Sequence, residues 1–170
     1  MWPFDRKKRR VDSELRRFAS YLSPDVVKVL ADRSPREPLF ERGEIPFALL
    51  QVRDDKAENV GRHLARAMTI VSEAGGLADM MSSFVFVIFG FPRGAWASVL
   101  EKPSVENGRR LSAALLQDMG ADVKVIYGTA AGVVGNLGGP HHLYYGAAIP
   151  DFGTLMAKLV QLEFGRVEAI

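Results

Sequence analysis

Cysteine is absent from this sequence of 170 residues. Without thiols the chain forms no disulfide, no zinc–thiolate site and no cysteine nucleophile. Apolar runs of membrane-spanning length are also absent, because the longest run, residues 84–91, has the length of a buried strand. The basic cluster near the N-terminus is followed by an amphipathic polar segment, where a secretory signal would have an apolar stretch. These absences predict a cytoplasmic protein.

The composition is ordinary, with one local excess of charge. The sequence is 48% hydrophobic and 25% charged, as in soluble globular proteins, and its length suits one domain. Residues 1–17 contain seven basic and three acidic residues and therefore carry +4, whereas the whole chain carries +2. The remainder is slightly acidic, which argues against a nucleic-acid-binding domain.

The basic segment predicts a mobile arm over residues 1–12. Two aromatic residues, Trp2 and Phe4, stand beside a basic cluster. The cluster consists of Arg6, Lys7, Lys8, Arg9 and Arg10. Aromatic and basic side chains together suit an anionic surface, so one interpretation is a peripheral contact with the inner face of a membrane. The alternative is a solvated tail, which is the more common behaviour of such termini.

Residues 13–45 are predicted to form N-terminal helices and a proline-bearing connector, and residues 46–170 a compact domain. In the domain, hydrophobic periodicity and glycine stops predict the order β-α-β-β-α-β, then a hairpin and a last helix. The expected strands cover residues 46–53, 77–81, 84–89, 123–127, 129–134 and 166–170, and the expected helices 58–74, 109–119 and 153–164. We therefore expect an α+β, ferredoxin-like fold with a mostly antiparallel sheet and helices on one face.

Four segments match one protein family in order and spacing. Residues 21–27 read YLSPDVV, residues 84–90 read FVFVIFG, residues 129–138 read TAAGVVGNLG, and residues 157–159 read AKL. They resemble, in turn, the YLSPxVV lead-in, the GDxxMAVFG strand, the xGxVVxGNIG hairpin and the NxAARL helix of class III adenylate/guanylate cyclases. The resemblance covers about residues 20–165 and implies the class III nucleotide cyclase fold.

The resemblance also implies a particular chemistry. In this family two aspartates hold two divalent cations beside a nucleoside triphosphate. One aspartate ends the first strand, and the other lies in a Gly-Asp turn before the middle strand. A lysine ahead of that turn contacts the base. An asparagine and an arginine on the last helix come from the other protomer of a head-to-tail, two-fold dimer.

The positions of this chain that match the metal and base contacts hold other residues. Gln51 and Ser83 stand in place of the two aspartates, and Ser82 stands in place of the turn glycine. Asp79 stands in place of the base-contacting lysine. Glutamine and serine are neutral, whereas a magnesium ion bound to triphosphate needs anionic oxygen ligands. The resemblance therefore implies a degenerate site with no metal.

The last helix departs from the family in the same way. Thr154 stands in place of the asparagine, or Pro150 in a shifted register, and Lys158 stands in place of the arginine. A lysine does not reproduce the forked donor geometry of arginine. Because both halves of the site are changed, we expect no cofactor and no cyclase activity.

Three functional hypotheses follow. The leading one is a catalytically inactive signalling or interaction module that pairs with a second copy or with a partner signalling protein. Apolar residues available for such pairing are Met80, Met81, Leu143, Tyr144 and Tyr145. The second is a regulatory domain that binds a nucleotide. The third is an active cyclase with displaced metal ligands, for which Asp54 and Asp55 are candidates, although paired acids at a strand end more often cap the next helix.

Overall fold

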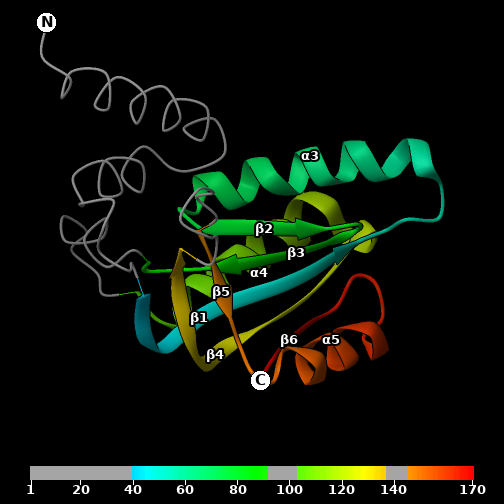
Figure 1. The fold of residues 1–170 in the computed structure, drawn as a ribbon. Coiled ribbons are helices and arrows are strands. Elements are labelled where there is room, and N and C mark those ends of the chain that lie inside the picture. The colour runs from blue at the N-terminus through cyan, green and yellow to red at the C-terminus, as the bar shows by residue number, and fades with distance from the viewer. Residues whose placement is uncertain (1–39, 92–102, 137–144) are drawn as a thin grey trace, which may run out of the picture.

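The computed structural model describes residues 40–91, 103–136 and 145–170 (Figure 1). The expected arm, the N-terminal helices and the apolar positions Leu143 and Tyr144 lie outside the described residues. The strands are β1 (Phe40–Val52), β2 (Leu77–Met81), β3 (Phe84–Ile88), β4 (Val123–Asn136), β5 (Tyr145–Ala148) and β6 (Val167–Ala169). The helices in the described residues are α3 (Ala57–Glu73), α4 (Val105–Met119) and α5 (Phe152–Gln161), and a 3-10 turn covers Gly120–Asp122.

One sheet organises the described part of the chain. Its strand order is β2-β3-β1-β4-β5, all in antiparallel pairs, and β6 joins β4 in the parallel sense. The β1–β4 pair is the longest, with partners running from Phe40↔Gly135 to Val52↔Val123. The predicted α+β fold with a mostly antiparallel sheet is therefore confirmed.

The expectation that all helices cover one face of the sheet was wrong for α5. Along β1, Ala48 and Leu50 pack in the core beneath α3 and α4, whereas Phe47 and Leu49 pack on the opposite face together with Leu159 of α5. Figure 1 shows α5 on the side of the sheet away from α3. The physical reason is that β1 is apolar on both faces, so each face needs a covering layer.

Two strands are longer than expected because they pair with each other. β1 begins at Phe40, inside the expected connector, and β4 continues through Gly128, where two separate strands were expected. A Cβ atom on Gly128 would collide with the carbonyl oxygen of Ile170. This glycine therefore marks a close approach of the C-terminal segment and not a break in β4.

Helix α4 starts four residues before the expected position 109. The Ser104 hydroxyl accepts a hydrogen bond from the Glu106 amide at 3.3 Å, and the Asn107 side chain accepts one from the Ser104 amide at 2.9 Å. These reciprocal bonds form a capping box with asparagine in the place of the usual Glu or Gln. Within the described ranges, none of the helices has the length and apolarity needed to cross a membrane.

Candidate functional site

The two positions expected to replace the metal ligands do lie together. Gln51 is half-buried near the end of β1 and pairs with Phe84 of β3. Ser83 directly precedes Phe84, is 1% exposed, and its carbonyl oxygen accepts a hydrogen bond from the Val52 amide at 2.9 Å. The fold thus brings the end of β1 and the β2–β3 turn to one end of the sheet.

The side chain of Ser83 already has a partner at this end of the sheet. Its hydroxyl donates a hydrogen bond to the Asp54 carboxylate at 3.0 Å. Asp54, a candidate displaced ligand, is therefore an acceptor that ties the segment after β1 to the β2–β3 turn. In residues 40–91, 103–136 and 145–170 there is no group of three or more His, Cys, Asp and Glu side chains that could hold a metal ion.

A buried lysine adjoins these positions, and the sequence analysis did not single it out. Lys124 of β4 pairs with Gln51 and is 5% exposed. Its ammonium donates hydrogen bonds to the carbonyl oxygens of Val160 and Leu162, both at 2.9 Å. Burial lowers the pKa of Lys124, and the negative charge of Asp54 acts in the opposite direction. The available signal was a charged residue within an apolar strand pattern.

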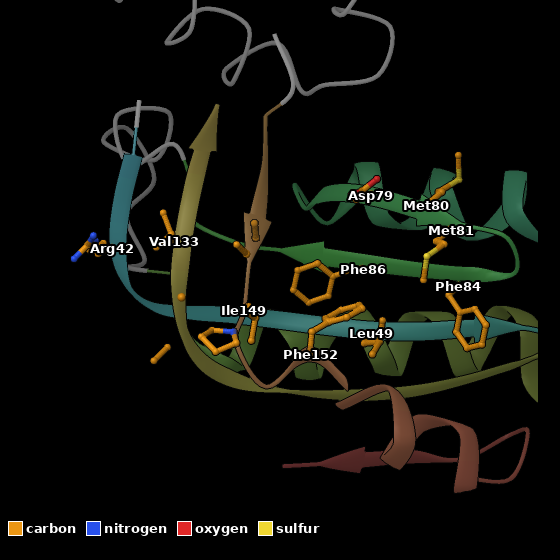
Figure 2. Close-up of a pocket in the computed structure, with 15 residues that line it drawn as sticks. Arg42, Leu49, Asp79, Met80, Met81, Phe84, Phe86, Val133, Ile149 and Phe152 are labelled. Carbon is orange, nitrogen blue, oxygen red and sulfur yellow. The ribbon is translucent and has the colours of Figure 1, made fainter. Parts of the chain in front are cut away.

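A cavity of about 710 Å³ lies on the α5 face of the sheet (Figure 2). Figure 2 shows Phe86 and Phe152 in its middle, between Arg42 of β1 and Met80 of β2. The Phe86 and Phe152 rings meet edge to face, with 5.3 Å between their centroids. The lining is mainly apolar, and Asp79 and Arg42 are its charged members. This chemistry suits an apolar surface or the body of a small molecule better than a triphosphate.

The other expected site positions separate in space. Asp79 is exposed on β2 and lines the cavity. Thr154 and Lys158 are exposed on α5 and are not among the lining residues. Pro150, the alternative position for the family asparagine, does line it. The structure therefore brings Gln51 and Ser83 together but places Thr154 and Lys158 elsewhere on the same chain.

The β2–β3 turn predicts a measurable gain in stability. Ser82, which stands in place of the turn glycine, has φ of 58°, a left-handed conformation that costs a residue with a Cβ roughly 1–2 kcal/mol. We expect Ser82→Gly to raise the free energy of unfolding by about 0.5–1 kcal/mol, measured by urea denaturation. Ser72→Gly, at an exposed position in α3, is the matched control and should lower it by a similar amount. Destabilisation by both substitutions would contradict the argument from φ.

Comparison with known proteins identifies the fold. No protein-family model matches the sequence, and no curated protein matches it significantly. The guanylyl cyclase Cya2 is similar in structure, with a TM-score of 0.53 and 15% identity over 76% of this chain and 75% of that one. The adenylyl cyclase CyaB from P. aeruginosa gives a TM-score of 0.52 and 16% identity over 75% of this chain and 76% of its own.

A bacterial light-regulated adenylyl cyclase matches over more of this chain. Its TM-score is 0.61 at 12% identity, and the match covers 96% of this chain and 54% of that protein. At these identities the likeness is one of fold. The chain has the nucleotide cyclase fold that its sequence motifs predicted.

Proposed function

We propose that this chain is a non-catalytic domain of cyclase fold that acts by pairing with a second copy of itself. The observation that carries the proposal is the chemistry of the α5 face of the sheet. Neutral Gln51 and Ser83 stand at the expected metal positions, whereas the neighbouring surface is apolar and open. Met80 and Met81, on the edge strand β2, are 52% and 60% exposed.

The donor groups present do not fit a pair of divalent cations. Such cations require several anionic oxygen ligands close together. At this end of the sheet Gln51 offers an amide, Ser83 offers a hydroxyl that donates to Asp54, and Lys124 adds a buried ammonium. Asp54 already accepts the hydrogen bond of Ser83, and the described residues contain no group of three His, Cys, Asp or Glu side chains that could hold a metal ion, which supports a non-catalytic function.

A second copy is the occupant that suits the apolar cavity best. Contiguous apolar surface rimmed by polar groups commonly marks an interface, and two-fold pairing buries the same patch on both partners. The family resemblance implies two-fold pairing of such domains. Met80 and Met81 belong to the same cavity lining, so a second copy seated there would bury their exposed side chains.

The pairing predicts a change in mass on a single substitution. We expect Met81→Glu to convert a homodimer at micromolar concentration to monomer, because a carboxylate would be buried without a partner. Light scattering after gel filtration measures the mass. Val105→Glu is the matched control, since Val105 is 43% exposed on α4, on the opposite side of the sheet, and should leave the dimer intact. A monomeric parent protein at high concentration would contradict the pairing and point to a different partner protein.

A regulatory nucleotide is the second candidate, and the size of the cavity is the observation that favours it. A volume of about 710 Å³ falls within the range of small-molecule sites. A thermal-shift series with ATP, GTP and cyclic nucleotides, with and without Mg²⁺, separates the candidates. Binding at 100 times the dissociation constant stabilises a protein by about 2.7 kcal/mol. A nucleotide-specific shift in the parent that Phe152→Ala abolishes would support the regulatory candidate over self-pairing.

A further inference from the structure

Two neighbouring methionines give strand β2 an exposed apolar surface. Met80 and Met81 are 52% and 60% exposed, and β2 stands at the end of the strand order β2-β3-β1-β4-β5. Both residues line the cavity on the α5 face, and Figure 2 shows them at its β2 side. Their thioether groups are therefore open to solvent in the single chain.

The other methionines in the described residues are less exposed. Met119 is 5% exposed and belongs to the core beneath α3 and α4. Met68 of α3 and Met156 of α5 are half-buried and pack against the core clusters of the two faces. Oxidation of sulfur side chains follows their exposure, and the sequence has no cysteine that would react first. A dissolved oxidant therefore reaches Met80 and Met81 before the other three.

Hydrogen peroxide is an oxidant that changes these side chains without a cofactor. The methionine sulfur attacks one peroxide oxygen, the O–O bond breaks, and a sulfur–oxygen bond forms. The sulfur loses two electrons and the peroxide gains them. The proton on the transferred oxygen passes to the departing hydroxide, which leaves as water. The product, methionine sulfoxide, is polar and chiral, whereas the thioether is apolar.

Self-pairing converts this change of polarity into a change of assembly. A second copy seated on the cavity would bury Met80 and Met81, and a buried sulfoxide needs hydrogen-bond donors that the mainly apolar lining does not offer. The same burial keeps peroxide away from both sulfur atoms in the dimer. Oxidation therefore proceeds through the free chain and prevents that chain from pairing.

We propose that Met80 and Met81 form a modification site at which peroxide oxidation blocks self-pairing and self-pairing blocks oxidation. This inference rests on the proposed function and adds to it a means of regulation. It has two consequences that the exposure of a methionine alone does not have. Pairing becomes weaker when the two sulfur atoms are oxidised, and their oxidation becomes slower as the concentration of the chain rises.

The test treats the full chain with hydrogen peroxide at chain concentrations below and above the dissociation constant of the dimer. Peptide mass spectrometry follows the sulfoxide at each methionine, and light scattering after gel filtration measures the mass. We expect Met80 and Met81 to be oxidised first, and more slowly at the higher chain concentration. Met68 of α3, on the other face of the sheet, should react at a rate that does not depend on chain concentration.

The expected effect on pairing is large and reversible. Because sulfoxides would be buried without donors, we expect the dissociation constant of the oxidised dimer to rise about tenfold or more. Reduction by the two methionine sulfoxide reductases, one for each epimer, should restore the mass of the dimer.

Two double variants separate these sulfur atoms from other effects of peroxide, and each is compared with itself before and after treatment. Met80→Leu with Met81→Leu keeps apolar side chains of similar volume and removes both sulfur atoms, so treatment should leave its dissociation constant unchanged. Met68→Leu with Met156→Leu is the matched control. It removes two half-buried sulfur atoms and should remain as sensitive to peroxide as the parent chain.

Four results would overturn the inference. One is a chain oxidised at both Met80 and Met81, with native circular dichroism, that pairs as tightly as before. Another is equal weakening in the variant that carries Met80→Leu and Met81→Leu. The third is oxidation of the two residues at a rate independent of chain concentration. The fourth is loss of native circular dichroism on oxidation, because monomer would then arise from unfolding. Failure of the proposed function has a different signature: the untreated chain is already monomeric at high concentration, which removes the basis of this inference as well.

Discussion

Incubated with ATP or GTP and either Mg²⁺ or Mn²⁺, the purified protein will form no cyclic AMP or cyclic GMP. The reaction needs two cations that neutralise charge on the attacking and leaving oxygens, and neither Gln51 nor Ser83 supplies an anionic ligand. Chromatographic separation of the products, with an intact class III cyclase as positive control, measures the yield. We expect a signal indistinguishable from a reaction without protein over hours of incubation.

The strongest contrary result would be turnover that depends on a displaced ligand. If product formed and then disappeared on Asp54→Asn or Asp55→Asn, the carboxylates after β1 would be acting as metal ligands. Glu73→Gln is the matched control, because Glu73 is an exposed acid at the end of α3 and is not among the residues that line the cavity. Loss of product in all three variants would instead indicate an effect on folding or on net charge.

The elements that the sequence predicted best are those with a strong local pattern. Strand β2 has the predicted bounds, Leu77–Met81, and α3 differs from its prediction by one residue at each end. Helix α3 places apolar residues at i, i+4, i+8 and i+11, and Gly75 follows its end in a left-handed conformation. Such signals lie within a few residues of one another, so no knowledge of distant partners is needed.

The features that the sequence did not predict depend on distant partners. The start of β1 at Phe40 is fixed by Gly135 on β4, far along the chain. Lys124 was missed for the same reason, since its acceptors are backbone carbonyl oxygens 36 and 38 residues away. Every residue type has such an oxygen, so the side chains at those positions give no signal in the sequence. In the candidate site, the family motifs predicted that Gln51 and Ser83 would meet, but not that Asp54 would accept the hydrogen bond of Ser83.

The substitution Gly→Ala should change the free energy of unfolding in opposite directions at two helical glycines. The change at Gly108 of α4 should be the larger of the two. In an exposed helix, Gly→Ala stabilises by about 0.5–1 kcal/mol. A Cβ atom at Gly108 would lie 2.8 Å from the carbonyl oxygen of Phe47 and 3.0 Å from Cβ of Tyr127. The first contact is to the backbone of the central strand β1, which cannot move aside. Because crowding in a packed core costs about 1–3 kcal/mol, we expect Gly108→Ala to lower the free energy of unfolding by about 1–2 kcal/mol.

Gly61 of α3 is the matched control, because a Cβ atom there would meet nothing within 4 Å. Gly61→Ala should therefore raise the free energy of unfolding by the full propensity difference of about 0.5–1 kcal/mol. Urea denaturation of both variants measures the two changes, and an unchanged dependence on urea concentration shows that the unfolded states remain comparable. If Gly108→Ala stabilised the protein as much as Gly61→Ala, α4 would have room to move away from β1. That result would contradict the close packing of α4 on the sheet and the core that Leu111 and Leu115 form.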